Sequence, residues 1–230
     1  MPSRYASFKP ETLDFLRELS ANNNREWFAA NKARYEEQVL DVALHFIQSM
    51  QEPLRKIAPH FVAVPKRMGG SLMRVYRDTR FSKNKAPYKT NIGIQFRHEN
   101  ARDVHAPGFY VHIDPEEVFL GAGMWHPDPV ALAAVRQRID AKQAEWIRAR
   151  DDRKFRANFE LGGDSLSRPP KGFAKDHPLI DDIRRKDFIA VRNLELDAPL
   201  DRQFQKKVEA SFATAVPFMT FLCKALGVSL

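Results

Sequence analysis

The chain has 230 residues, 43% of them hydrophobic and 29% charged, and its formal net charge at pH 7 is +8. This composition allows a substantial apolar core. Nowhere do about 18 consecutive apolar residues occur, which argues against a transmembrane helix, and residues 1–10 lack the apolar run of an export signal. We therefore expect a cytoplasmic protein with no membrane partner.

Length and composition predict one domain over residues 1–230. Two domains of about 100 residues each would also fit the length, but no Gly/Ser linker, low-complexity tract or internal repeat marks a boundary. The single cysteine, Cys223, cannot form an intramolecular disulfide. It lies on an apolar helical stretch, so we expect a buried, inert thiol in a reducing compartment.

Helical spacing dominates residues 10–58. Pro10 suits the first turn of a helix, and leucines recur at helical intervals until a run of asparagines breaks the pattern. Asn23 is the expected N-cap of a second helix, with Glu26 as its reciprocal partner. The apolar stripe of that helix continues to Met50. These helices form the N-terminal region of the predicted domain.

Alternation of apolar and polar residues replaces helical spacing in the sheet region, residues 71–125. The connections are too short for helical crossovers, which predicts an antiparallel sheet. The expected strands lie near 72–77, 91–97, 109–113 and 118–124, with a fifth over 188–194. A four-residue turn at 114–117 would set three pairs: Ile113 with Val118, His112 with Phe119, and Tyr110 with Gly121.

Residues 128–226 are expected to hold helices and a long loop. Asp128 as N-cap and Pro129 at the first helical position open one helix. The segment 161–177 contains glycines and prolines and predicts an irregular loop, and Pro217 must kink or split the C-terminal helix. The fold class that follows is a single α+β domain, in which helices pack on a central antiparallel sheet of about four to five strands.

Three glycines, at positions 93, 121 and 123, fall on the polar face of the predicted sheet and place no side chain there. They would leave a shallow hollow that a ligand can approach. The polar residues expected beside it are Asn91, Gln95, Tyr110 and His112. The alternative is that an aromatic ring, from Trp125 or Trp27, fills this space.

The densest charge cluster lies between Lys66 and Lys89, where eight Lys or Arg accompany one acid, Asp78, and leave a net charge of +7. Such a cluster repels itself unless an anion or a fixed carboxylate neutralises it. Asp78 and Thr79 favour a turn, around which three guanidinium groups would converge to bind phosphate or carboxylate oxygens. The expected anion-binding residues are Arg74, Arg77, Arg80, Lys85, Tyr88 and Lys89.

Two other interpretations of this cluster stay open. Asp78 and acids such as Asp114 or Glu116 would pair with the arginines and lock the loop from within. In that case Arg77→Ala would leave a buried Asp78 unpaired and destabilise the protein. Otherwise the cluster is a solvated surface.

The run from Arg74 to Tyr88, RVYRDTRFSKNKAPY, resembles the signature of the family called domain of unknown function 2461. The resemblance extends from Phe8 to about Leu226. It includes NNREWF at 23–28, GAGMW at 121–125, PKGF at 170–173 and DHP at 176–178. It implies a domain of similar length and brings no established activity with it.

Motifs of known catalytic classes are absent from the sequence. There is no phosphate-binding loop ending in Gly-Lys-Ser/Thr, no dinucleotide-binding glycine pattern and no Gly-x-Ser-x-Gly elbow, so the sequence indicates no cofactor. His112, Asp114, His126 and Asp128 could meet as metal ligands. Histidine is common on half-buried strands and Asp128 already serves as an N-cap, so we predict no metal.

Three functional hypotheses follow. The first is a domain that binds the phosphates of nucleic acid or of a nucleotide through the basic cluster, with Tyr88 and Phe81 as stacking rings. The second is an enzyme acting on a phosphorylated small molecule, in which His112, Tyr110 or Asp78 moves a proton. The third is a structural or partner-binding module whose arginines only hold their own loop.

Overall fold

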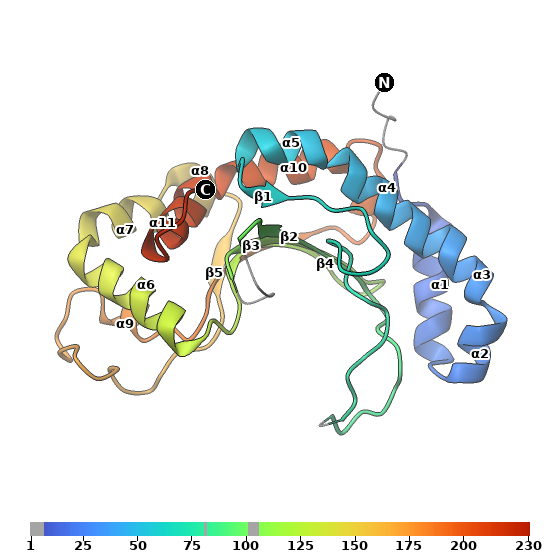
Figure 1. Ribbon diagram of the computed structural model, residues 1–230, viewed down its shortest axis with the longest axis horizontal. Coiled ribbons are helices and arrows are strands. Elements are labelled where there is room, and N and C mark those ends of the chain that lie inside the picture. Colours follow the sequence, from blue (N-terminus) through green and yellow to red (C-terminus); the bar gives the residue numbers. More distant parts are fainter. Residues whose placement is uncertain (1–6, 81, 101–105) are drawn as a thin grey trace.

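An antiparallel sheet of six strands organises the described part of the chain, which comprises residues 7–80, 82–100 and 106–230 of this computed structural model. The strands lie in the order β1-β2-β3-β4-β6-β5 (Figure 1). Their bounds are β1 (Phe61–Val62), β2 (Ile92–His98), β3 (Gly108–Ile113), β4 (Val118–Met124), β5 (Glu160–Gly162) and β6 (Phe188–Leu194). The predicted α+β class is confirmed, with a slightly larger sheet than expected.

The register of the β3–β4 hairpin follows the prediction made from its turn. Ile113 lies opposite Val118, and the next pairs along the face are His112 with Phe119 and Tyr110 with Gly121. The backbone N–H of Asp114 donates to the carbonyl of Glu117 at 2.9 Å and closes the turn. A short turn fixes register because it leaves only one way to pair the flanking residues.

The prediction of a strand near 72–77 was wrong. That segment makes two isolated bridges, Leu72 with Ile94 and Tyr76 with Tyr88. Its residues therefore pair with two different segments in turn, and no continuous ladder forms. Conversely, β1 and β5 are so short that alternation in the sequence could not reveal them.

The N-terminal helices are α1 (Pro10–Ala21), α2 (Arg25–Ala30), α3 (Lys32–Tyr35), a π-helical segment (Glu36–Leu40), α4 (Asp41–Ser49) and α5 (Gln51–Ile57). The expected N-cap was displaced by one residue. The side chain of Asn24 caps α2 by accepting from the backbone N–H of Trp27 at 2.9 Å. Asn23 instead bonds to both backbone groups of Tyr88, each at 3.0 Å.

The remaining helices are α6 (Pro129–Ala141), α7 (Gln143–Arg150), α8 (Arg153–Arg156), α9 (Ile180–Ile183), a 3₁₀ turn (Ala198–Leu200), α10 (Phe204–Thr214) and α11 (Val216–Ala225). Asp128 caps α6, as predicted, by accepting from the backbone N–H groups of Val130 and Ala131. Pro217 lies in the first turn of α11, so the predicted split of the C-terminal helix is confirmed.

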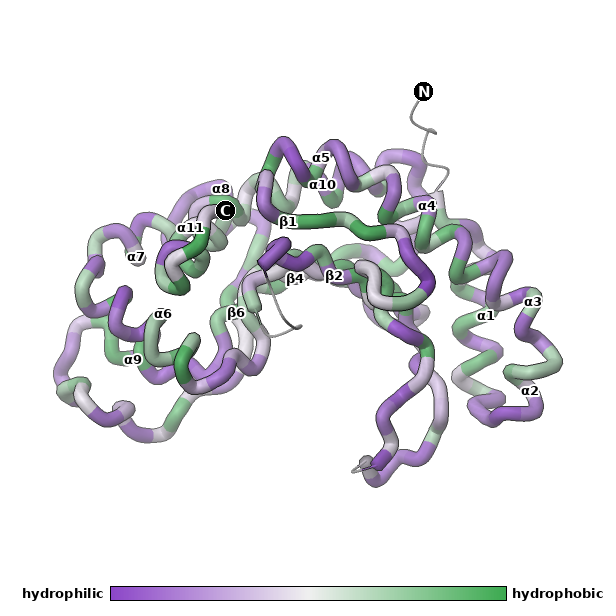
Figure 2. Tube along the Cα trace, viewed as in Figure 1, coloured by the Kyte–Doolittle hydropathy of each residue, from purple (hydrophilic) through white to green (hydrophobic). Residues whose placement is uncertain are grey.

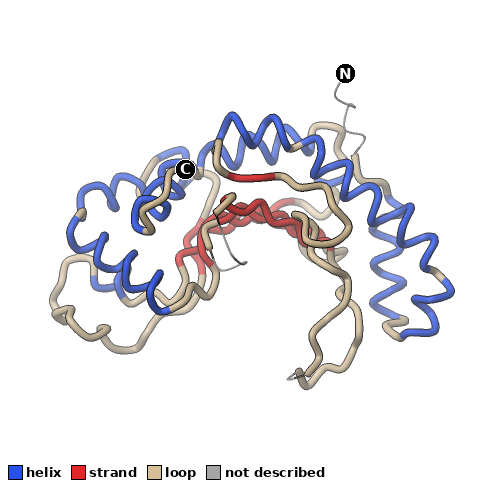
Figure 3. Tube along the Cα trace, viewed as in Figure 1, coloured by secondary structure: helices blue, strands red, loops and turns tan. Residues whose placement is uncertain are grey.

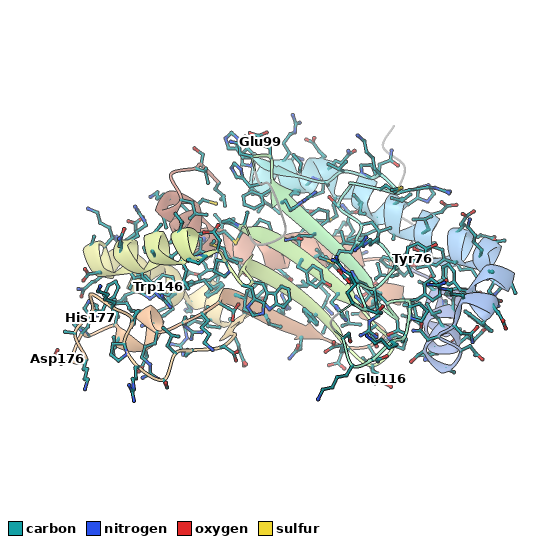
Figure 4. All side chains as sticks on the ribbon, turned by 60° about the horizontal axis from the view of Figure 1, so that its bottom comes forward. Tyr76, Glu99, Glu116, Trp146, Asp176 and His177 are labelled. Atoms are coloured by element: carbon teal, nitrogen blue, oxygen red, sulfur yellow. The ribbon has the colours of Figure 1, made fainter. Side chains whose placement is uncertain are left out.

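The two faces of the sheet have different surroundings. Helices α4, α5 and α10 lie over one face (Figure 3), and Phe212 of α10 packs on Phe109 with ring centroids 4.7 Å apart. Alternate residues of the strands, such as Ile94 and Val111, are fully buried on that side. No described helix crosses the other face of β2, β3 and β4 (Figure 4). We call this second surface the open face.

The C-terminal helix α11 places Cys223 in the core, as predicted. Burial raises the pKa of this thiol to about 12, because an apolar surrounding disfavours the thiolate. None of the described helices is both long and apolar enough to cross a lipid bilayer.

Candidate anion-binding site

The basic cluster forms a loop that rises from the sheet, here called the basic loop (residues 74–89). Its two arms are held together at the base by backbone bonds from Arg77 N–H to Pro87 O at 2.9 Å and from Lys89 N–H to Val75 O at 2.7 Å. The loop projects away from the helices and strands (Figure 1). Figure 2 shows hydrophilic residues along most of it. The sequence pattern thus produces a protruding, charged segment.

The base of the basic loop is fixed to the N-terminal helices. Tyr88 is buried, and its ring stacks on Phe28 of α2 with centroids 4.1 Å apart and planes 19° apart. The two bonds from Asn23 to the backbone of Tyr88 hold the same residue. Tyr88 therefore anchors the loop, and its ring does not form a binding surface as expected from the sequence. The exposed ring on the described loop is that of Tyr76, which is 54% exposed (Figure 4), and Phe81 lies outside the described residues.

The acid of the cluster, Asp78, pairs with Arg80. The guanidinium donates from Nε at 3.0 Å to Oδ1 and from a terminal nitrogen at 2.6 Å to Oδ2. The side-chain bonds and the Arg80 backbone N–H hold the pKa of Asp78 at about 2. Both side chains are exposed. Asp78 thus pairs with one of the three arginines, as the lock interpretation expects, but it lies at the surface and its partner is Arg80, so the buried pair with Arg77 is wrong.

Neither of the other acids proposed for a lock pairs with an arginine of the loop. Asp114 accepts from the backbone N–H of Glu116 at 3.0 Å and so caps its own turn. It also lies 3.4 Å from the hydroxyl of Thr90, which ties the base of the loop to the β3–β4 turn. Glu116 is exposed in the turn between β3 and β4 (Figure 4). The carboxylates near the loop thus serve their own turn.

Two arginines of the basic loop have no acidic partner among the residues that the structure describes. Within residues 7–80, 82–100 and 106–230, no carboxylate pairs with Arg74 or Arg77. Arg74 is exposed and close enough to Asp78 and Lys89 to lower the pKa of each. Arg74 and Arg80 therefore both approach Asp78, while Arg77 stands at the base of the same arm.

The lysines of the loop also lack acidic partners in the described structure. Lys85 is exposed and donates from Nζ to the carbonyl of Thr79 at 2.9 Å. Lys83 is exposed as well. Lys89 is half-buried, and its pKa is lowered because burial disfavours the ammonium and Arg74 repels it. The loop can therefore offer several unpaired cations to an anion.

A second polar group lies on the open face at the end nearest the basic loop. His112 Nδ1 is 3.2 Å from the hydroxyl of Tyr110 and 3.4 Å from the amide nitrogen of Asn91. Its Nε2 is 3.4 Å from Oε1 of the exposed Glu117. Burial lowers the pKa of His112 and raises that of Tyr110 to about 12. A neutral imidazole between a phenol and a carboxylate can accept or pass a proton.

The hollow expected over the glycines is filled by other residues. A Cβ at Gly93 would lie 2.7 Å from the hydroxyl of Tyr110 and 3.1 Å from the sulfur of Met73. The three atoms nearest to such a Cβ belong to Tyr110 and Met73 and not to either tryptophan named as the alternative. Tyr110, expected beside the hollow, thus occupies it.

The structure does not gather the four residues considered as metal ligands. Among the described residues, no group of three or more His, Cys, Asp or Glu could hold a metal ion. His126 lies beside Asp187, with its Nδ1 3.3 Å from Oδ1. Asp128 is engaged as the cap of α6.

Asp187 is a buried carboxylate that the sequence did not single out. One oxygen accepts from the backbone N–H of His126 at 2.7 Å, and the other from the backbone N–H of Asp164 at 3.2 Å. It therefore joins the end of β4 to the loop after β5. Its partners are distant in sequence, so no local pattern marks it.

Fold and site together define an α+β domain with an exposed basic loop beside the open face of an antiparallel sheet. The chain belongs to the family described as conserved hypothetical protein (DUF2461), whose profile matches residues 11–221. No curated protein and no solved structure matches the chain.

Proposed function

We propose that this protein binds nucleic acid through its phosphate groups, using the cations of the basic loop. The observation that carries the proposal is that Arg74 and Arg77 have no carboxylate partner among the described residues. A guanidinium group binds two phosphate oxygens at once through its planar pair of N–H donors. Lys83 and Lys85 extend the same charge along the loop.

A polymeric phosphate suits this geometry better than a single nucleotide. The charges are spread along a projecting loop (Figure 1) rather than gathered in a cavity. The cavity beside its base, lined by Met73, Lys89 and Asn91 among others, has a volume of about 10 Å³. Pockets that enclose small ligands measure roughly 300–1,000 Å³. Nucleic acid can instead lie across exposed cations, since its phosphates repeat along the strand.

Binding to a fluorescently labelled oligonucleotide tests the proposal by anisotropy. Each phosphate contact to a single strand contributes about −0.7 to the slope of log K against log salt concentration. The double variant R74A/R77A removes two such contacts, so its slope should be shallower by about 1.4, with weaker binding at every salt concentration. The same measurement with a duplex of equal length shows whether the affinity depends on the density of phosphate charge.

The matched control is K206A/K207A, which removes the same charge from exposed positions on α10. That helix covers the other face of the sheet (Figure 3), so affinity and slope should stay near those of the wild type. No binding by the wild type at about 50 mM salt would sink the proposal. Equal losses in the two double variants would show that net charge, and not the loop, governs binding.

A second candidate is an enzyme that acts on a phosphorylated small molecule held by the basic loop. The contacts of His112 with Tyr110, Asn91 and Glu117 favour it, because they orient a neutral imidazole. Asp78 is less suited to move a proton, since its pKa of about 2 keeps it ionised. In a screen of phosphorylated compounds, His112→Ala should abolish turnover while the far-ultraviolet circular dichroism stays unchanged. Turnover that persists in this variant would exclude His112 as the proton carrier.

A further inference from the structure

The open face carries a row of aromatic rings that starts near the basic loop. His112 and Phe119 stack with centroids 4.5 Å apart and planes only 8° apart. The ring of Tyr110 follows at 5.8 Å from Phe119. All three are partly exposed. Planar side chains arranged in this way on an uncovered sheet offer flat surfaces to other rings.

The row continues along β4 to Trp125. Alternate residues of a strand point to the same face, so Phe119 and Gly121 share the open face, and Trp125 follows Met124, the fully buried last residue of β4. Trp125 is 55% exposed. Trp125 lies four positions after Gly121 in the chain.

The backbone turn at Trp125 and His126, here called the corner, is held in place by Asp187. His126 has φ = 48°, a left-handed conformation that non-glycine residues rarely adopt. The buried carboxylate of Asp187 holds this residue through its backbone N–H at 2.7 Å and faces its Nδ1 at 3.3 Å. A large exposed ring on an anchored corner binds a partner at low entropic cost, because its backbone is already ordered.

The positive charge of the basic loop indicates which class of ligand fits the open face. The basic loop, with its excess of cations, leads directly into β2, so it borders the end of the open face that carries His112. A ligand that lies on both surfaces needs phosphates at one end and flat rings along the other. Single-stranded nucleic acid has both, and its bases are free to stack on protein rings. In a duplex the bases are stacked on each other and cannot meet the face of Trp125.

We infer that the open face binds the bases of single-stranded nucleic acid, with Trp125 as a stacking residue, while the basic loop holds the adjoining phosphates. This inference rests on the proposed function and names its ligand more closely. The rings supply base contacts that are independent of sequence, since every base has a flat face.

The test compares two labelled strands of about 12 nucleotides that carry the same number of phosphates, oligo-dT and an abasic strand. The wild type should bind oligo-dT at least about 5-fold more tightly than the abasic strand. Trp125→Ala should weaken binding to oligo-dT by about 5- to 100-fold and leave the abasic strand unaffected. Trp125→Phe keeps a ring and should restore most of the affinity.

A matched control is Ile147→Ala, which truncates an exposed apolar side chain on α7; it should bind both strands as the wild type does. Quenching of tryptophan fluorescence by oligo-dT should be much smaller in Trp125→Phe, because Trp146 is buried and Trp27 is partly buried against Phe15.

The outcomes separate the two proposals. If both strands bind equally and R74A/R77A weakens both, the phosphate proposal holds and the stacking inference is overturned. If Trp125→Ala binds oligo-dT like the wild type, Trp125 is not a stacking residue and the inference also fails. Absence of binding to either strand removes both proposals.

Discussion

Replacing Asp187 by alanine should destabilise the protein by about 2–5 kcal/mol. The side chain is 3% exposed and accepts from two backbone N–H groups, those of His126 and Asp164. Removing it leaves both donors without their acceptor, and a hydrogen bond to a charged group contributes about 1.5–3 kcal/mol. Water that enters the vacated space recovers part of this, which sets the lower figure.

Urea denaturation followed by circular dichroism measures this loss. Asp187→Asn keeps one acceptor oxygen and replaces the other with a donor, so it should lose about half as much free energy of unfolding or more. The control is Asp181→Ala, because Asp181 is 92% exposed and only approaches Arg184 at 3.4 Å. A loss below about 1 kcal/mol for Asp187→Ala would refute the reasoning, since the two backbone bonds could not then be holding the corner.

Three further predictions concern single residues. Asp78→Asn releases Arg80 from its ion pair and removes a negative charge, so anisotropy should show tighter oligonucleotide binding and a salt slope steeper by about 0.7. Burial lowers the pKa of His112 from 6.5, so the unfolded chain binds more protons below that value. Stability is therefore lost as pH falls below about 6.5, and His112→Asn should reduce this loss in urea titrations at about pH 7.5 and 5.5. Gly123→Ala should cost about 3 kcal/mol or more in thermal or urea unfolding, since φ is 127° and a Cβ would meet a backbone carbonyl oxygen at 2.0 Å, whereas Gly172→Ala, with φ of 96° and open space, should cost about 1 kcal/mol.

Contrary results would be equally clear for each. Unchanged affinity in Asp78→Asn would mean that Arg80 does not reach the ligand. A pH profile of His112→Asn that matches the wild type would assign the acid sensitivity to other groups. Equal losses in the two glycine variants would show that the close carbonyl moves aside.

The central sheet could be predicted because its information is local. Alternation marked the strands, and the short turn at 114–117 determined the pairing of Ile113 with Val118. The segment 72–77 has a similar alternation, but its fate depended on which distant residues, Ile94 and Tyr88, were available to pair with it. Local pattern cannot decide between a strand and two isolated bridges.

The position of the basic loop was predicted from the sequence, but its contacts only in part. Charge density located the basic loop, but three arginines lie within reach of Asp78 in sequence, and only the folded backbone selects Arg80 as its partner. Tyr88 was expected to offer a stacking ring because it lies within the basic cluster. Tyr88 is buried because it packs on Phe28 and is bonded by Asn23, two residues that lie far from it in the sequence.

The two outer strands have a consequence for behaviour at high concentration. A long edge with free backbone N–H and C=O groups recruits strands from other molecules. Here the sheet terminates in β1, which has two residues, and β5, which has three. Each presents too few hydrogen-bonding groups to template an intermolecular ladder, so the fold carries its own protection against edge-to-edge aggregation.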